Sequence, residues 1–197
     1  MPTANLTFIL GGARSGKSAH AEQLATTHAA HTVTYIATAR GTAGDHEFAT
    51  RIAHHQTRRP THWHLLEAPW DLAAAIVQAD GHGHCILIDC LTLWLANFLC
   101  PFDEADAHGI SKDSKDSEGG KHYATQLAAL ETALTSATGQ IIVVSNEIGL
   151  GVVPLGSLTR QYVDELGRLN QRIATLSTRV TLMVAGVPLA VKTVAHA

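Results

Sequence analysis

Charged residues are scarce in this chain of 197 amino acids: Asp, Glu, Lys and Arg together make up 16%, and the formal net charge is −3. A protein that binds nucleic acid through its phosphates needs an excess of basic side chains, so we expect no nucleic-acid partner. Hydrophobic residues make up 46% of the chain, which argues against intrinsic disorder. This length and composition suit one compact domain spanning residues 1–197.

Cysteine is also rare, with only Cys85, Cys90 and Cys100 present. Their odd number and the lack of a C-x-x-C pair argue against a disulfide framework and a zinc knuckle. The 13 histidines include no ligand spacing such as H-E-x-x-H, so they predict no structural metal site. No apolar run is long enough to cross a bilayer, and the N-terminus lacks the basic segment of a signal peptide. We therefore expect a cytoplasmic protein without a membrane span.

Short β-rich runs alternate with helical stretches along the chain. We expect strands at residues 6–10, 33–37, 85–89, 141–145 and 180–184, and helices at residues 17–27, 70–78, 91–99, 123–136 and 157–177. Apolar runs such as "CILI" and "IIVV" are typical of a parallel sheet covered on both faces. The pattern predicts a three-layer α/β fold. Residues 101–122 are polar and without apolar periodicity, which predicts a mobile surface loop or lid.

A phosphate-binding loop is predicted at residues 11–18, "GGARSGKS", which match the pattern G-x-x-x-x-G-K-[ST] between a strand and a helix. In such a loop the backbone amides of residues 12–17 line a phosphate chain, Lys17 neutralises the outer phosphates, and the Ser18 hydroxyl can bind Mg²⁺. The candidate nucleotide-binding residues here are Gly11, Gly12, Ala13, Arg14, Ser15, Gly16, Lys17 and Ser18.

A carboxylate follows the buried strand in "CILIDC", where Asp89 could hold or orient Mg²⁺. The alternative is that Asp89 caps the helix expected from Leu91. The chain lacks the N-K-x-D motif with which GTPase switches read the base, which disfavours that class of protein.

A histidine pair lies in "DHEFATRIAHHQTRRP", residues 45–60. If residues 45–58 are helical, one face carries Glu47, Arg51, His54 and Arg58, and an adjacent apolar stripe carries Phe48, Ile52 and His55. Arginines can bind phosphate oxygens while a neutral imidazole attacks phosphorus, so this face suits His54 as a nucleophile. A histidine pair on a surface helix is, however, more often without a catalytic role.

Six segments in this order resemble one enzyme family: "GGARSGKSAHAE", "YIATA", "RIAHHQTRRPTHW", "LIDCLTLWLANFL", "VSNEIGLGVVP" and "RQYVDELGRLNQRIA". Together they closely resemble the bifunctional adenosylcobinamide kinase/adenosylcobinamide-phosphate guanylyltransferase of cobalamin biosynthesis. The resemblance implies an α/β, P-loop NTPase-like (RecA-like) fold, with a mainly parallel sheet and helices on both faces. It covers nearly the whole chain except residues 101–122.

The resemblance implies two reactions. A nucleoside triphosphate, ATP or GTP, phosphorylates adenosylcobinamide; GMP then passes from GTP, through a guanylyl-histidine, to the cobinamide phosphate with release of pyrophosphate. It places that histidine at His54, with His55 as the structural alternative. It also implies a homotrimer and Mg²⁺ as cofactor, held by Ser18 and Asp89.

Further residues around the GTP follow from the resemblance alone. Beside residues 11–18, they are Thr38, Ala39, Arg40, His55, Gln56, Thr57, Arg58, Glu67 and Asp89. The segment "NEIGLGVVP", residues 146–154, follows a buried strand, and ligands bind at that edge of such sheets. We expect Asn146 and Glu147 to serve substrate or Mg²⁺ binding; the alternative is a plain strand-to-helix turn.

Two other functions remain open at this stage. The first is a small-molecule kinase in which His54 only binds phosphate. The second is a nucleotide-dependent regulatory or scaffold protein without a covalent step.

Overall fold

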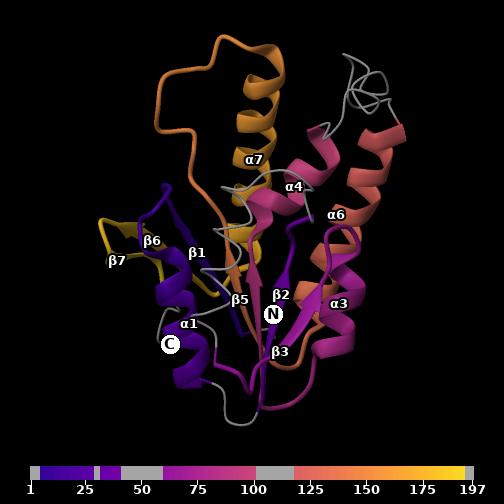
Figure 1. Cartoon of the computed structure of the whole chain (residues 1–197), viewed down its shortest axis with the longest axis vertical. Helices are drawn as coiled ribbons and strands as arrows, with labels where there is room; N and C mark the ends of the chain where they lie inside the picture. The colour runs from indigo at the N-terminus through magenta and orange to yellow at the C-terminus, as the bar shows by residue number, and fades with distance from the viewer. Residues whose placement is uncertain (1–4, 29–31, 41–59, 101–117, 194–197) are drawn as a thin grey trace.

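A seven-stranded sheet organises the molecule (Figure 1). The computed structural model describes residues 5–28, 32–40, 60–100 and 118–193. The strand order is β3-β2-β4-β5-β1-β6-β7. The strands are β1 (Asn5–Gly11), β2 (Thr32–Ala37), β3 (His64–Glu67), β4 (His84–Asp89), β5 (Gln140–Val144), β6 (Arg179–Val184) and β7 (Val187–Lys192). All neighbouring strands pair in parallel except β6 and β7, which are antiparallel.

Helices cover both faces of the sheet, as the apolar strands require. The described helices are α1 (Lys17–His28), α3 (Leu72–Ala79), α4 (Leu91–Leu99), α6 (Glu118–Ser136) and α7 (Ser157–Leu176). One buried cluster joins the sheet to α3, α4, α6 and α7, with Trp94 as its largest fully buried side chain. The other joins the opposite face to α1 through Ala21 and Ala25. The predicted three-layer α/β architecture is thus confirmed.

The five expected strands and five expected helices are all present, with shifted ends. Two strands were not predicted, β3 and β7, because neither carries an apolar alternation with a buried face: most residues of β3 and all of β7 are exposed. The helix expected from residue 123 begins at Glu118, so residues 118–122 of the predicted loop are helical. The rest of that loop, residues 101–117, and the predicted helix at residues 45–58 lie outside the described residues.

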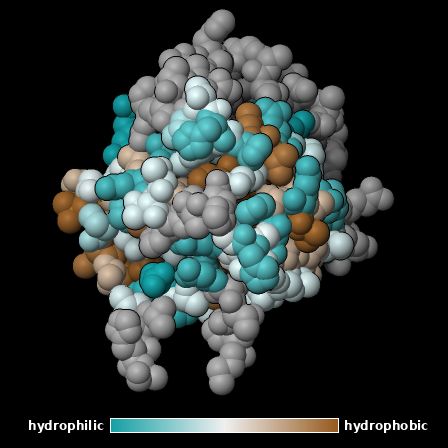
Figure 2. Space-filling model, turned by 90° about the horizontal axis from the view of Figure 1, so that it is seen from below, coloured by the Kyte–Doolittle hydropathy of each residue, from teal (hydrophilic) through white to brown (hydrophobic). Residues whose placement is uncertain are grey.

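Exposed apolar side chains gather at two places, the β6–β7 edge of the sheet and the segment between β5 and the first turn of α7. Seen from below, the hydrophobic residues at the left of Figure 2 gather on the side where β6 and β7 lie in Figure 1; Val187, Leu189 and Val191 of β7 are exposed. Within the described part of the chain, no helix combines the length and the apolar character that spanning a membrane would take.

Asp80 ties the end of α3 to the turn between α6 and β5. Its carboxylate accepts hydrogen bonds from the backbone N–H groups of Thr138 and Gly139, at 2.8 to 3.0 Å, and from the Thr138 hydroxyl. Burial acts to raise the pKa of Asp80, but these hydrogen bonds and one from Gly81 outweigh it, so the pKa is lowered. The ionised carboxylate is therefore a stabilising contact between two distant parts of the chain.

Asp80→Asn should lower the free energy of unfolding by about 1 kcal/mol at pH 7, because an amide offers one acceptor oxygen in place of two charged ones. A carboxylate with a lowered folded-state pKa stabilises the fold above its unfolded pKa of about 3.9 and loses that contribution as pH falls through the folded pKa. The difference between the two proteins should therefore shrink below about pH 4. Urea unfolding at pH 7 and pH 3 measures it.

Asp71→Asn is the matched control. Asp71 caps α3 by accepting a hydrogen bond from the Ala74 N–H at 2.9 Å, and asparagine caps helices about as well. We expect this variant to stay within about 0.5 kcal/mol of the wild type at both pH values. A loss in Asp80→Asn that is equally large at pH 3 would contradict the role assigned to its charge.

Candidate functional site

The predicted phosphate loop joins β1 to α1 at the carboxyl edge of the sheet. β1 ends at Gly11 and α1 begins at Lys17, so the N–H groups of the first helical turn face the loop and favour an anion there. Position 11 accepts only glycine, because a Cβ there would lie 2.6 Å from the Met183 carbonyl oxygen. Within the part of the chain that the structure describes, the buried Ser15 hydroxyl has no hydrogen-bond partner. The loop therefore has the donors that a phosphate chain requires.

The turn between β6 and β7 braces this loop. The Gly186 N–H donates a hydrogen bond to the Ser15 carbonyl oxygen at 3.0 Å, and a Cβ on Gly16 would lie 3.3 Å from the Gly186 Cα. Gly186 has a φ of 86°, which favours glycine. Sequence reasoning missed this contact because it depends on β7, which gave no strand signal.

Lys17 is folded back onto its own loop. Its Nζ donates a hydrogen bond to the Gly12 carbonyl oxygen at 2.6 Å, and the residue is only 8% exposed. Burial lowers the pKa of Lys17, while Cys90 and Asp89 act to raise it. The ammonium group thus lies on its own loop, within electrostatic reach of Asp89.

Asp89 ends β4, which is separated from β1 only by β5. Two strand spacings correspond to about 10 Å, a distance that a triphosphate with its metal can bridge. One carboxylate oxygen of Asp89 accepts a hydrogen bond from the buried Tyr35 hydroxyl at 3.1 Å. The alternative role as a helix cap is wrong, because the N-cap residue of α4 is Cys90.

Thr38 is fully buried, and its hydroxyl forms hydrogen bonds with the backbone of Cys90, the residue after Asp89. It donates to the Cys90 carbonyl oxygen at 2.7 Å and accepts from the Cys90 N–H at 3.0 Å. The Asn97 side-chain amide in turn donates to the carbonyl oxygens of Thr38 and Pro69. Thr38 therefore holds the ends of β2 and β4 together, a contact that the sequence did not predict.

The remaining described candidates lie on the far side of Asp89. Ala39 and Arg40 follow β2, and the Arg40 guanidinium lies 5.0 Å from the centre of the Trp70 ring. Glu67 ends the edge strand β3, four strands from β1, or roughly 19 Å away by strand spacing. Glu67 therefore lies away from the phosphate loop, with β2, β4 and β5 between its strand and β1. His54, His55, Gln56, Thr57 and Arg58 lie outside the described residues.

The segment after β5 is held from three sides. The Asn146 N–H donates to the Thr92 hydroxyl at 2.8 Å, and the Asn146 carbonyl oxygen accepts from the Asn170 side chain at 3.0 Å. The Glu147 N–H donates to the Gly11 carbonyl oxygen at 3.0 Å. Because β5 lies between β1 and β4, this segment leaves the sheet directly between the phosphate loop and Asp89.

Residues 7–191 match the protein family described as cobinamide kinase / cobinamide phosphate guanyltransferase. The chain belongs to this family. It is thus a bifunctional cobinamide kinase and cobinamide phosphate guanylyltransferase of cobalamin biosynthesis, which confirms the resemblance of its motifs.

Two relatives of this family cover almost the whole chain. The bifunctional adenosylcobalamin biosynthesis protein CobP of Pseudomonas aeruginosa is 49% identical over 185 residues, which are 94% of this chain and 96% of the relative. The bifunctional adenosylcobalamin biosynthesis protein CobU of Escherichia coli is 34% identical over 194 residues, or 95% of this chain and 99% of the relative.

Solved ATPases share the fold of this cobinamide kinase. The assembled ATPase EscN of the enteropathogenic E. coli type III secretion system has a TM-score of 0.53 at 13% identity, covering 93% of this chain and 43% of that one. A prototypical type III secretion ATPase of pathogenic bacteria has a TM-score of 0.50 at 13% identity, covering 90% and 50%. The chain spans half or less of either ATPase, and the likeness confirms the P-loop NTPase-like (RecA-like) fold alone.

The donor set of this cobinamide kinase fits the expected Mg²⁺. Among the described residues, no group of three or more His, Cys, Asp or Glu side chains could hold a metal ion. Mg²⁺ with a nucleotide does not need one, because phosphates and waters supply most of its ligands beside one or two protein oxygens. The Ser18 hydroxyl at the start of α1 and the Asp89 carboxylate are oxygen donors of this kind, and α1 packs against β4.

Proposed function

We propose that this cobinamide kinase and guanylyltransferase phosphorylates adenosylcobinamide with ATP or GTP and then transfers GMP from GTP to the phosphorylated corrinoid through a guanylyl-histidine at His54. The products are adenosylcobinamide-GDP and pyrophosphate. The observation that carries the proposal is the loop at residues 11–18 facing Asp89 at one edge of the sheet, in a chain of this family.

In the first reaction the aminopropanol hydroxyl of adenosylcobinamide attacks the terminal phosphorus of the triphosphate. The oxygen–phosphorus bond to the substrate forms, the bond to the nucleoside diphosphate breaks, and the hydroxyl proton is released. The loop amides and the Ser15 hydroxyl hold the phosphates, and the Lys17 ammonium exchanges the Gly12 carbonyl for phosphate oxygens. Such positioning and charge neutralisation account for most catalysis of phosphoryl transfer.

In the second reaction an imidazole nitrogen of His54 attacks the α-phosphorus of GTP. A nitrogen–phosphorus bond forms, and the bond to the oxygen bridging to the β-phosphate breaks, so pyrophosphate leaves. A phosphate oxygen of adenosylcobinamide phosphate then attacks the same phosphorus and frees the imidazole. Arg58, on the same predicted helix face as His54, suits binding of the phosphate oxygens.

Ser18 and Asp89 would hold Mg²⁺, which supplies charge neutralisation at the phosphates when bound. Nucleotide contacts are assigned to Gly11–Ser18 by the loop motif and to Thr38, Ala39, Arg40, His55, Gln56, Thr57, Arg58 and Glu67 by the family resemblance. The buried Thr38 hydroxyl suits an indirect role, since Cys90 already occupies it. The proposal further includes a single domain over residues 1–197, a homotrimer and a cytoplasmic location.

The direct test is to supply wild-type protein with adenosylcobinamide, Mg²⁺ and either ATP or GTP, and to separate the corrinoid products by liquid chromatography and mass spectrometry. ATP alone should give only adenosylcobinamide phosphate, whereas GTP should give adenosylcobinamide-GDP with one pyrophosphate per molecule. Phosphorylation without any guanylylated product would show that the protein is a kinase without guanylyltransferase activity.

Tyr35→Phe should raise the Mg²⁺ concentration needed for half-maximal nucleotide binding roughly 10-fold, because groups that orient a metal-binding carboxylate tune its affinity. The variant removes only the hydroxyl that donates to Asp89. Calorimetric titration of the nucleotide at graded Mg²⁺ concentrations measures the effect, while affinity without Mg²⁺ should stay unchanged.

Tyr162→Phe is the matched control, since it also removes a tyrosine hydroxyl, one that donates to the Thr92 carbonyl oxygen at 2.7 Å. Both variants should lose some stability, but only Tyr35→Phe should shift the Mg²⁺ dependence. If nucleotide binding depended on Mg²⁺ concentration equally in the two variants, either Asp89 would not bind the metal or Tyr35 would not orient Asp89.

A further inference from the structure

The segment between β5 and the first turn of α7 exposes an unusual number of large apolar side chains. We call residues 148–155, together with Leu158, the apolar loop. Leu150, Val152 and Leu155 are each at least 85% exposed. Ile148, Val153 and Leu158 are also exposed. Contiguous apolar surface of this kind on a protein marks a binding site for a ligand or a partner.

The apolar loop starts at the phosphate-binding site. Glu147, directly before it, donates its N–H to the Gly11 carbonyl oxygen at 3.0 Å, and Asn146 is anchored by Thr92 and Asn170. In Figure 1 the segment projects beyond the carboxyl edge of the sheet, alongside the first turns of α7. A ligand on this segment would therefore bind on the same side of the sheet as the loop at residues 11–18.

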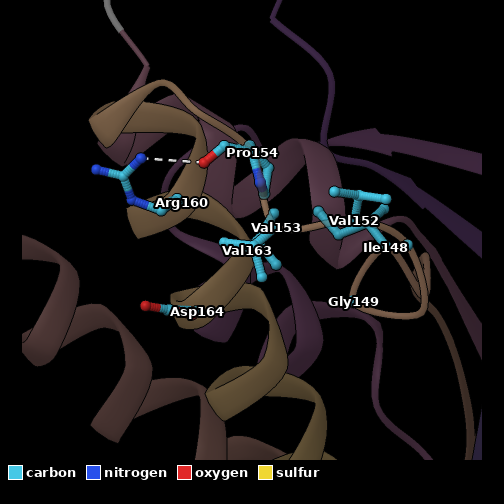
Figure 3. A pocket seen from close by; sticks show the side chains of 9 residues that line it. Ile148, Gly149, Val152, Val153, Pro154, Arg160, Val163 and Asp164 are labelled. Carbon is cyan, nitrogen blue, oxygen red and sulfur yellow. Dashed lines mark hydrogen bonds between the residues drawn. The ribbon is translucent and has the colours of Figure 1, made fainter.

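Between the apolar loop and α7 lies a hollow of about 140 Å³ (Figure 3). Its walls are apolar and polar in similar measure: Val152 and Val153 come from the loop and Val163 from α7, and Arg160 and Asp164 line it one turn apart on α7. The Arg160 guanidinium also donates to the Pro154 and Leu155 carbonyl oxygens. This ties the loop to the helix, so the hollow is formed in advance of binding.

We infer that the apolar loop and this hollow are the docking surface for the corrin ring of the acceptor; this inference rests on the proposed function. A corrinoid such as cobinamide is a large macrocycle whose edge carries methyl groups and neutral amide arms. The exposed leucine and valine side chains match the methyl-bearing edge. The hollow is too small for the ring but can take one amide arm, which Arg160 and Asp164 can meet with a donor and an acceptor.

The position of the apolar loop also suits the phosphoryl transfer. The acceptor hydroxyl must reach the terminal phosphorus, so the ring has to bind beside the phosphate loop rather than on it. Two described segments contact the phosphate loop and carry exposed apolar side chains, the β6–β7 turn through Gly186 and the segment after β5 through Glu147. The segment after β5 also borders the hollow. A second copy of the chain is the other occupant that the experiment has to distinguish.

The test uses the double variant Leu150→Asn/Val152→Asn, at two positions so exposed that folding does not depend on them. Dicyanocobinamide binding is measured by equilibrium dialysis without nucleotide, and the KM for adenosylcobinamide is measured with saturating ATP. We expect both constants to rise at least roughly 10-fold, because two apolar contacts are lost, with kcat within about twofold. Binding of ATP and labelling of the protein by GTP should be unchanged.

Val77→Asn is the matched control, an equally conservative change at a 70% exposed valine on α3, away from the loop. It should leave every constant unchanged. Unchanged cobinamide binding in the double variant would overturn the inference, and so would a drop in particle mass in analytical ultracentrifugation, which would assign the apolar loop to subunit contact. Failure of the wild type to phosphorylate adenosylcobinamide would instead contradict the proposed function.

Discussion

Replacing His54 with alanine is expected to abolish the covalent guanylyl adduct and to lower guanylyl transfer to adenosylcobinamide phosphate by on the order of 1,000-fold or more, since removal of a nucleophile eliminates the covalent route. Phosphorylation of adenosylcobinamide should continue, because in the proposed function residues 11–18, and not His54, bind the phosphates of the nucleotide. The measurement is incubation with Mg²⁺ and GTP labelled at the α-phosphate, followed by denaturing electrophoresis under alkaline conditions, which preserve an acid-labile phosphoramidate.

His55→Ala is the informative control, because the two histidines are adjacent in sequence but fall on different faces of the predicted helix. It should retain the label, with at most a loss of nucleotide affinity or of stability. If His54→Ala kept the radiolabelled adduct and His55→Ala lost it, His55 would be the nucleophile and His54 the structural residue. An unlabelled wild type that still binds GTP would contradict the guanylyl-histidine altogether.

Lys17→Met should lower kcat for phosphorylation of adenosylcobinamide roughly 100- to 1,000-fold, because the variant removes the positive charge that stabilises the developing charge on the transferred phosphate. Methionine keeps most of the apolar stem of this buried side chain. Lys17→Arg should restore little, since the guanidinium is larger than the ammonium that fits beside the Gly12 carbonyl. Steady-state kinetics with ATP and thermal unfolding of each variant give the two readouts.

Lys192→Met separates this effect from the loss of an ordinary lysine contact. The Lys192 Nζ also donates to backbone carbonyl oxygens, those of Ala174 and Thr175, but from β7 and away from Asp89. It should alter stability slightly and kcat not at all. A Lys17→Met enzyme with nearly normal kcat would show that the lysine serves the loop's structure and not the reaction.

Much of the fold was predictable because its signals are local. The buried strands are short and rich in β-branched and other apolar residues, continuously so in "CILI" of β4 and "IIVV" of β5, so residues within a few positions of each other reveal them. β3 and β7 escaped prediction for the opposite reason. "HLLE" and "VPLAVK" carry no buried face, and they are strands only because β2 and β6 offer an edge to pair with. Pro188 in β7 is tolerated there because an edge strand can lack one donor.

The site divides in the same way. The sequence alone determined the phosphate loop, the carboxylate at the end of β4, the histidine pair and the family, because each is written in contiguous residues whose chemistry depends on type and spacing. Only the tertiary structure decided that the Tyr35 hydroxyl donates to Asp89, that Thr38 bonds Cys90, that Gly186 contacts Ser15 and that Glu67 lies four strands from the phosphate loop. Those relations join residues up to 171 positions apart, as Gly186 and Ser15 are, and strand order sets them. No local pattern encodes which strand becomes the neighbour of which, because pairing depends on the free energy of the whole sheet.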